Sequence, residues 1–242
     1  MAPSLRRMLV LAVAALLGAG AQAEPGLQWV AGDLPPFASA GDDRPRGYAH
    51  DLAMAMAARL GRSIEVQYVP WARAVRMAEQ GPDIGIFPLA RTPDRETRFQ
   101  WLLPLMPVRF GIYGRAGAKQ LDLPALRQLR VGVLRGSLLT TNLRVAGFVN
   151  IVEGKDYRDL LRRLHHGMLD AVYAGTPMLE AAMDDYGQPR NRFMLHTTLG
   201  GATLYMAASR DLAADEAERW ITAYRQLESD GTVAQLRRRY LH

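Results

Sequence analysis

The stretch from Ser63 to Phe87, SIEVQYVPWARAVRMAEQGPDIGIF, contains a complete strand–helix–strand unit. Its first part, SIEVQYV, is short and rich in β-branched and aromatic residues, which is typical of a strand. DIGIF, at 83–87, predicts a second strand in the same way. Between them, apolar residues recur three and four positions apart, as on one face of a helix: Trp71, Ala74, Val75 and Ala78. This order favours a parallel sheet with a helix on one face.

The same alternation extends in both directions along the chain. Upstream, LQWVA (27–31) predicts a strand, and HDLAMAMAARLG (50–61) predicts a helix that ends at a glycine. Downstream, strands are expected at 130–134, 150–153, 170–174 and 202–209, with helices at 137–147, 156–167 and 178–187. Two amphipathic helices close the chain. We therefore expect an α/β protein with two successive βα sets and a ligand cleft between them.

Composition excludes several classes of function. The chain has 242 residues, 49% hydrophobic and 22% charged, and it has no cysteine. Disulfides, thiolate metal sites and a cysteine nucleophile are therefore ruled out. The net charge of +6 is spread along the chain, and LRRRY (236–240) is its only dense basic patch, which argues against nucleic acid. No HExxH, phosphate-loop, GxSxG or dinucleotide motif is present, and we expect neither a metal nor a cofactor.

Residues 1–23 have the features of a secretory signal. Arg6 and Arg7 precede the apolar run MLVLAVAALLGAGA, and AQA (21–23) supplies the small residues that a signal peptidase requires. The alternative is a membrane anchor, but the run is shorter than the roughly 20 residues that span a bilayer. We expect cleavage after Ala23 and, with no cysteine to form disulfides or carry a lipid, a periplasmic location.

Four stretches resemble one known family. GYAHDLAMAMAARLG (47–61) resembles a helix of the extracellular solute-binding proteins of family 3, which begins Gly-aromatic-x-x-Asp-Leu and ends Leu-Gly. DLPPF (33–37), EQGPDIGIFPLARTPDRETRFQWLLPL (79–105) and LRQLRVGVLRGSLL (126–139) resemble further segments of that family, in the family's order. The resemblance covers nearly all of the mature chain.

This resemblance implies a two-lobed, class II periplasmic-binding-protein fold, with a mixed, mainly parallel sheet flanked by helices in each lobe. Lobe 1 would comprise 24–110 and 206–242, and lobe 2 would comprise 111–205, with hinge strands near 108–115 and 203–209. Ligand binding would close the lobes. The implied function is that of a monomeric, non-catalytic receptor, which captures a small anionic or zwitterionic solute and presents it to an ABC permease or a membrane sensor.

Arg95 falls on the arginine that clamps the ligand's α-carboxylate in the family. A guanidinium suits this role because it is permanently charged and its planar fork can donate two parallel hydrogen bonds to a carboxylate. The alternative is a surface arginine paired with Asp94 or Glu96. The neighbouring Arg91 and Arg98 are expected to be solvated.

Thr92 and Pro93 have the pattern of a helix N-cap followed by proline in the first turn. The free backbone N–H groups of such a helix start would favour an anion beside Arg95. Ser137, after Gly136, falls on the family's lobe 2 contact to the same carboxylate. The alternative for Ser137, compatible with the first, is that it caps its own helix.

Trp71 lies close to a cleft-lining position of the family, where it could stack on a ring or cover a cation. It equally fits the core as part of an apolar stripe. Leu134 is expected to border the pocket. The remaining predicted ligand-binding residues are Leu34, Arg73, Phe87, Arg135, Leu138 and Gly175.

The chain also departs from the family pattern. Gly175 stands where the family has an acid that binds the ligand's amine, and Ala90 stands where it has a small hydroxyl residue. Phe87 and Pro88 replace polar residues. The cleft is therefore expected to be more apolar and more basic than that of an amino-acid receptor, so a carboxylate without an amine is at least as plausible a ligand.

An enzyme on the same fold is the alternative function. A periplasmic dehydratase that resembles cyclohexadienyl dehydratases would need a carboxyl group in the cleft as general acid. The sequence offers only Asp33 and Asp51 for this role, and Asp51 is also a candidate helix N-cap.

Overall fold

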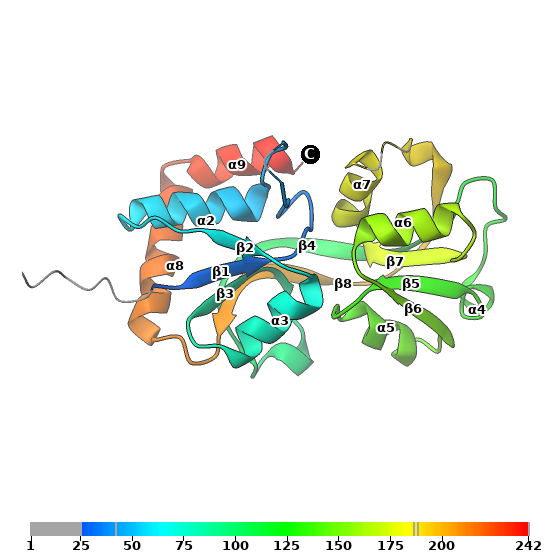
Figure 1. Ribbon diagram of the computed structural model, residues 1–242, viewed down its shortest axis with the longest axis horizontal. Helices are drawn as coiled ribbons and strands as arrows, with labels where there is room; N and C mark the ends of the chain where they lie inside the picture. Colours follow the sequence, from blue (N-terminus) through cyan, green and yellow to red (C-terminus); the bar gives the residue numbers. More distant parts are fainter. Residues whose placement is uncertain (1–25, 42, 186, 188, 242) are drawn as a thin grey trace, which may run out of the picture.

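The computed structural model describes residues 26–41, 43–185, 187 and 189–241, so the predicted signal sequence lies outside the described residues. Within them, eight strands form one mixed sheet in the order β2-β1-β3-β8-β4-β7-β5-β6. Figure 1 shows two lobes, one built on each end of this sheet. No helix in these ranges is long and apolar enough to cross a membrane.

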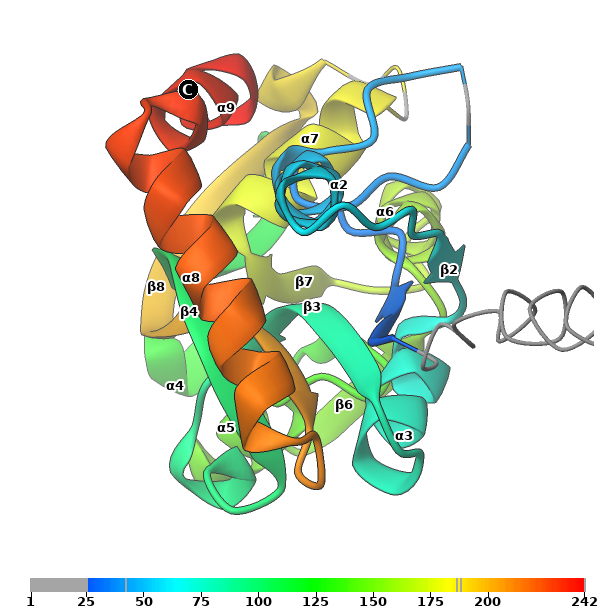
Figure 2. The ribbon, with the colours of Figure 1, turned by 90° about the vertical axis from the view of Figure 1, so that its left-hand side faces the viewer.

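Lobe 1 contains three parallel strands, β1 (Gln28–Ala31), β2 (Val66–Tyr68) and β3 (Ile84–Ala90). Its helices are α2 (Tyr48–Arg59), α3 (Trp71–Gln80), α8 (Ala214–Ser229) and α9 (Thr232–Tyr240). The last two helices pack against α2 (Figure 2), and Arg237 of α9 donates to the hydroxyl of Tyr48 at 3.2 Å. The C-terminal segment is therefore part of the lobe in which the described chain begins.

The prediction that Asp51 caps α2 is wrong. The N-cap is Gly47, with φ 104°, and a Cβ there would lie 2.5 Å from the carbonyl carbon of Phe37. Glycine alone fits this crowded position with a positive φ. The helix therefore begins at Tyr48, before Asp51. Asp51 instead accepts a hydrogen bond from Tyr240 of α9.

Lobe 2 contains the parallel strands β5 (Arg130–Leu134), β6 (Asn150–Gly154) and β7 (Ala171–Gly175). Its helices are α4 (Leu123–Leu126), α5 (Leu139–Val145), α6 (Tyr157–His165) and α7 (Thr176–Asp185). Asp156 caps α6 by accepting the N–H of Asp159 at 2.6 Å. The short η2 turn (Arg190–Arg192) leads out of this lobe.

Two long strands join the lobes. β4 (Phe99–Arg115) and β8 (Phe193–Ser209) pair with each other antiparallel along nearly their whole length. The sequence predicted only 202–209 of β8, because Gly200 and Gly201 are poor strand residues, and Pro104 and Pro107 obscure β4 in the same way. Shifts in the pairing register on either side of Pro104 accommodate that proline.

We place the crossing between the lobes where these two strands have only each other as partners. Pairing of β8 with β3 ends at Leu204, and pairing of β4 with β7 begins at Phe110. Between these points, 107–109 of β4 pairs with 201–203 of β8. The expected hinge segment 108–115 lies mostly on the lobe 2 side of this crossing, and the segment 203–209 lies mostly on the lobe 1 side. The exact limits of the lobes, drawn from the sequence, remain a prediction.

Candidate ligand-binding site between the lobes

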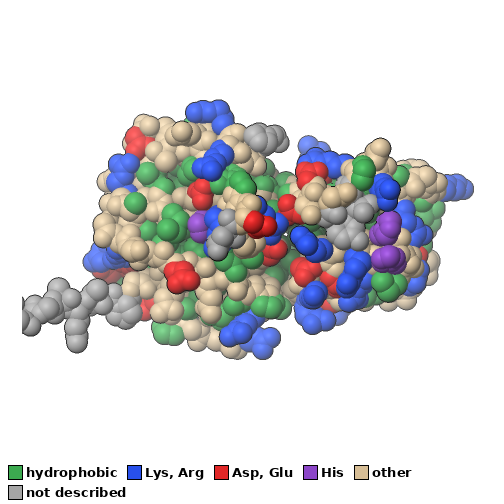
Figure 3. Space-filling view, turned by 45° about the horizontal axis from the view of Figure 1, so that its top comes forward, with side chains coloured by type: hydrophobic (Ala, Val, Ile, Leu, Met, Phe, Trp, Pro, Cys, Tyr) green, Lys and Arg blue, Asp and Glu red, His purple; other side chains and the backbone are tan. Residues whose placement is uncertain are grey.

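A cavity of about 40 Å³ lies where the two lobes meet at the crossing. Figure 3 shows the groove between the lobes from outside. Lobe 1 and the adjoining part of β8 contribute Leu34, Trp71, Pro88, Ala90, Arg95 and Leu204. Lobe 2 and the adjoining part of β4 contribute Phe110, Leu134, Ser137, Leu138, Leu139, Tyr157, Gly175 and Met178. The wall is mostly apolar, and Arg95 is its only charged member among the residues that the structure describes.

Arg95 is buried, with 5% of its surface exposed. It ends η1 (Pro93–Arg95), which directly follows the fully buried strand β3. Its Nη1 donates to the carbonyl of Ala90 at 3.3 Å, and its Nη2 donates to the carbonyl of Gly136 at 3.4 Å. Both bonds are long, and burial lowers the pKa of the guanidinium. Arg95 is therefore a desolvated cation that is weakly satisfied.

The alternative that Arg95 pairs with Asp94 or Glu96 is wrong. Among the described residues, no carboxylate oxygen lies within 4 Å of its guanidinium nitrogens. Glu96 pairs instead with Arg91, and Asp94 is exposed beside Arg98 at 3.8 Å. The neighbouring acids are thus held by the two arginines that remain in contact with solvent.

Arg91 and Arg98 are partly exposed, as the sequence predicts. The guanidinium of Arg91 also lies over the rings of Trp101 and Tyr205, and Arg98 pairs with Glu79. Arg91 and Arg98 therefore each have a protein partner outside the cavity. Of the three arginines, Arg95 is the one that borders the cavity.

Thr92 occupies the N-cap position before Pro93, as predicted, but its side chain does not cap η1. The N–H of Arg95 is satisfied by the carbonyl of Thr92 at 3.0 Å. The Thr92 hydroxyl is buried and has no hydrogen-bond partner among the described residues. The element is a single 3₁₀ turn, too short to supply the helix-start N–H groups that the sequence suggested.

Ser137 forms the lobe 2 side of the cavity and serves its own helix. Its hydroxyl donates to the carbonyl of Leu134 at 2.6 Å and accepts the N–H of Leu139 at 3.3 Å. A hydroxyl has one proton to donate. Ser137 can therefore donate to an anion only by releasing Leu134, and a ligand contact here remains a proposal.

Gly136 brings the lobes into direct contact. It has φ 76°, and a Cβ at this position would lie 2.6 Å from Cα of Ala72 at the start of α3. The loop before α5 thus lies against the first turn of a lobe 1 helix, with the Arg95 hydrogen bond to the Gly136 carbonyl beside it. The lobes are closed over the cavity in this conformation.

A second contact between the lobes lies at the rim. Arg44 of lobe 1 binds Asp33 of its own lobe at 2.8 Å and Asp185, at the end of α7, in lobe 2. The side chains are partly exposed, so the pair is open to screening by salt. Opening the lobes would break the bond to Asp185 and leave the bond to Asp33.

We expect Asp185→Asn to weaken solute binding by about two- to fivefold at low salt, because a partly exposed ion pair contributes about 0.2–1 kcal/mol. Titration calorimetry at two ionic strengths measures this, and the difference should vanish near about 0.5 M salt. Glu180→Gln is the matched control, because Glu180 is on the same helix and pairs with Arg190 within lobe 2. Equal effects of the two variants would contradict a role for the rim contact in closure.

Tyr157 and Met178 line the cavity but were missed by the sequence analysis. Tyr157 is 4% exposed, and burial raises the pKa of its hydroxyl, which the hydrogen bond to the backbone of Gly175 partly offsets. The side chain of Met178 fills the space beside Gly175, since a Cβ there would lie 2.4 Å from its terminal methyl carbon. Tyr157 follows the carboxyl end of β6, and Met178 follows that of β7. Parallel sheets bind ligands at this edge, so the position of both residues after a predicted strand could have indicated them.

Six of the nine predicted ligand-binding residues line the cavity: Leu34, Trp71, Arg95, Ser137, Leu138 and Gly175. Trp71 meets both expectations, because it borders the cavity and is also buried in the core with 6% exposure. With Leu134, which was also expected at the pocket, the sequence therefore located half of this wall.

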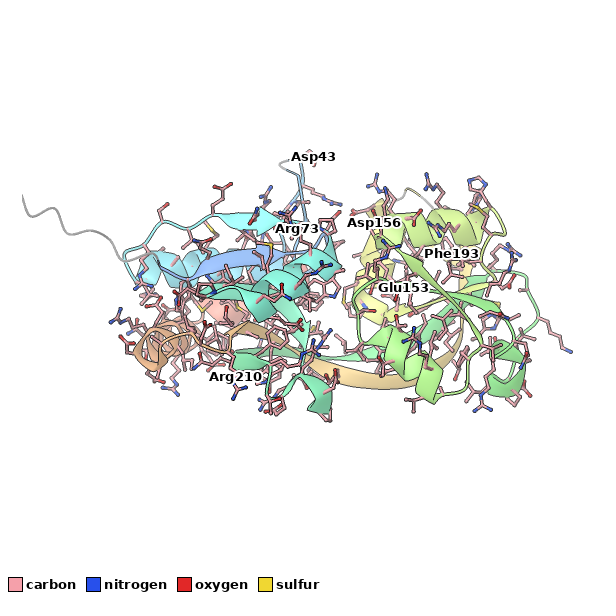
Figure 4. The ribbon with its side chains drawn as sticks, turned by 60° about the horizontal axis from the view of Figure 1, so that its bottom comes forward. Asp43, Arg73, Glu153, Asp156, Phe193 and Arg210 are labelled. Atoms are coloured by element: carbon pink, nitrogen blue, oxygen red, sulfur yellow. The ribbon has the colours of Figure 1, made fainter. Side chains whose placement is uncertain are left out.

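The other three predicted residues lie elsewhere. Phe87 is fully buried and packs on Trp29 with 5.5 Å between ring centroids, because alternate residues of β3 point to opposite faces and the cavity receives Pro88 and Ala90. Arg135 is exposed and faces Glu153 at 3.5 Å. Arg73 lies on a separate surface groove of α3, and Figure 4 shows it on the lobe 1 side of the gap.

Solved structures share this architecture. An ancestral arginine-binding protein bound to arginine is 20% identical, with a TM-score of 0.78 over 90% of this chain and 99% of that one. A histidine kinase sensor domain with similarity to periplasmic binding proteins is also 20% identical, with a TM-score of 0.79 over 88% and 95%. The GluR0 ligand-binding core of Nostoc punctiforme with L-glutamate is 17% identical, with a TM-score of 0.76 over 89% and 99%. At these identities the likeness shows the fold.

The sequence gives the family more directly. No curated protein matches the chain. The family model of bacterial extracellular solute-binding proteins, family 3, matches residues 29–242, which is nearly all of the described chain. With the two-lobed fold and the cavity at the crossing, this match establishes that the chain belongs to the bacterial extracellular solute-binding proteins of family 3.

Proposed function

We propose that this protein is an exported, non-catalytic receptor that captures a small carboxylate between its lobes. One observation carries the proposal: Arg95 is buried on the cavity wall, and no carboxylate of the described residues lies within ion-pair distance of it. Buried cations in proteins are nearly always paired with an acid or an anion. The missing partner is best supplied by the solute.

The local geometry supports a carboxylate as that partner. The two hydrogen bonds of Arg95 to backbone carbonyls are long and involve neutral acceptors. A carboxylate would replace them with shorter, charge-assisted bonds, and the planar guanidinium can donate two in parallel. Since the Gly136 carbonyl belongs to lobe 2, Arg95 would contact the solute and, when the lobes are closed, also lies against lobe 2.

The membrane protein that receives the solute is proposed only as a type of partner. Structures similar in fold include an amino acid ABC transporter substrate-binding protein from Streptococcus pneumoniae and a histidine kinase sensor domain. We propose that the protein acts as a monomer in the periplasm, after removal of its signal sequence, and delivers the solute to an ABC permease or to a membrane sensor.

The positions of the two candidate acids favour a receptor over a dehydratase. Asp33 is 46% exposed and pairs with Arg44, and Asp51 accepts a hydrogen bond from Tyr240 of α9. Neither acid lies on the wall of the Arg95 cavity. Among the described residues, the cavity wall includes no carboxyl group that could serve as general acid. Turnover of prephenate or arogenate by the purified protein would overturn this preference.

The proposed function is tested by thermal unfolding of the purified protein with a panel of small carboxylates, some with and some without an amino group. A solute that binds only the folded state stabilises it by about 2.7 kcal/mol at 100 times its dissociation constant. For a protein of this size, that corresponds to a rise in melting temperature of roughly 5–10 °C. Amines and neutral sugars of similar size should give no shift. A panel in which no carboxylate raises the melting temperature would contradict the proposal.

A further inference from the structure

We propose that the preferred solute is a short monocarboxylate without an amino group, an inference that rests on the proposed function and narrows it. The charged groups of the cavity decide this. Its wall carries one cation, Arg95, and no acid among the described residues. A ligand with one negative charge balances this site. An amino acid would instead add an ammonium group close to a buried guanidinium, with no counter-charge for it.

The end of β7 is where the wall is most clearly apolar. Gly175 has no side chain, and Met178 occupies the adjoining space with its terminal methyl group and sulfur. Phe110 closes the same corner, 3.9 Å from the position that a Cβ of Gly175 would take. A thioether sulfur is a weak acceptor, and an aromatic ring attracts a cation through its face but supplies no negative charge and no acceptor oxygen, whereas an ammonium group has three N–H groups to satisfy. The thioether and the ring suit the hydrocarbon part of a solute.

Polar groups near this corner are already used. The Tyr157 hydroxyl is bonded to the backbone of Gly175. Beyond Tyr157 lies a second cavity of about 60 Å³ with three acids on its wall. Two of them, Asp33 and Asp185, bind Arg44, and the third, Asp156, caps α6. Tyr157 lines both cavities and lies between these acids and the space beside Arg95.

The size of the cavity limits the solute. Its volume of about 40 Å³ exceeds the roughly 10–15 Å³ needed for one water. Among simple carboxylates, those with the shortest apolar chains, such as propionate and butyrate, are therefore the best match for the space between the closed lobes.

Matched pairs of ligands that differ by the amino group test the inference on the unmodified protein. The pairs are propionate with alanine, butyrate with 2-aminobutyrate, and 3-phenylpropionate with phenylalanine, measured by titration calorimetry. We expect the short amine-free acids to bind at least about tenfold more tightly than their amino-acid partners, because the buried ammonium group loses its hydration without gaining a counter-charge. If an amino acid binds as tightly as its partner, this inference is wrong while the proposed function stands. If neither member of any pair binds while another carboxylate of the panel raises the melting temperature, this inference is wrong and the proposed function stands.

A gain-of-function variant tests the role of the corner. Gly175→Asp combined with Met178→Ala supplies a carboxylate and removes the methyl group that a side chain at 175 would meet. We expect this variant to reverse the preference and to bind 2-aminobutyrate more tightly than butyrate. Met178→Ala alone is the control. It removes part of the apolar wall and should weaken binding of both ligands, but it adds no acid, so butyrate should still bind more tightly than 2-aminobutyrate. Folding of each variant is checked by circular dichroism, and a folded double variant that still prefers butyrate would overturn the assignment of this corner.

Discussion

Replacing Arg95 with methionine is expected to weaken binding of carboxylates by at least about 30-fold. The physical reason is the loss of two charge-assisted hydrogen bonds in a desolvated site, where removal of one partner of a buried charge pair costs about 2–5 kcal/mol or more. The solute's carboxylate would then be buried without any counter-charge. Titration calorimetry with the tightest carboxylate of the panel measures the loss directly.

The same substitution is expected to raise the melting temperature of the ligand-free protein. Arg95 is 5% exposed, and the only hydrogen bonds of its guanidinium in the described structure are two long ones to backbone carbonyls. Replacing a buried ion pair by apolar side chains of similar volume is often neutral or stabilising by about 1–4 kcal/mol, and a buried cation without an acid carries the cost of desolvation with no pairing energy to offset it. Each kcal/mol shifts the melting temperature of a protein of this size by roughly 2–4 °C. If Arg95→Met is more stable than the unmodified protein and does not bind carboxylates, Arg95 contributes to ligand binding and not to folding stability.

Arg98→Met is the matched control for Arg95→Met. Arg98 lies on the same turn, but it is exposed and pairs with Glu79. Its loss should leave binding unchanged and alter stability by at most about 1 kcal/mol. Two results would contradict the assignment of Arg95: affinity within about tenfold of the unmodified protein, or a large fall in the melting temperature without ligand.

Gly136→Ala is expected to weaken solute binding by more than about tenfold through a different cause. A methyl group at this position would lie 2.6 Å from Cα of Ala72 in the opposite lobe. Because that atom belongs to the backbone of α3, it cannot turn aside, and the lobes must separate. Separation also lengthens the Arg95 bond to the Gly136 carbonyl. Small-angle scattering with saturating solute should show the variant more open than the unmodified protein.

Left-handed backbone at Gly136 adds a cost that is unrelated to closure, and Gly117→Ala controls for it. Gly117 has φ 80°, close to the 76° of Gly136, but no heavy atom lies within 4 Å of the Cβ position. Both alanine variants should lose about 1–2 kcal/mol of folding stability from backbone strain. Only Gly136→Ala should also lose affinity. Equal affinities of the two variants would show that the contact between Gly136 and Ala72 is absent from the ligand-bound form.

The sequence was sufficient to predict elements whose signals are local. The stripe beginning at Trp71 forms α3, and RVGVL forms β5 with the predicted limits. Hydrophobic periodicity succeeds in such segments because each buries one face on the sheet beside it. The long strands β4 and β8 were incompletely predicted, because their prolines and glycines oppose strand formation and only pairing with each other overcomes this.

The candidate site divides in the same way. By itself, the sequence determined the family, the two sets of βα units and the likeness of Arg95 to a carboxylate clamp, because these depend on residue type and order along the chain. Only the tertiary structure decided that Arg95 is buried without an acid, that the Ser137 hydroxyl is already bonded to Leu134 and Leu139, and that Met178 fills the space beside Gly175. Burial and partners depend on which distant segments meet, and here they meet because β4 and β8 bring the carboxyl ends of strands from both lobes to one place.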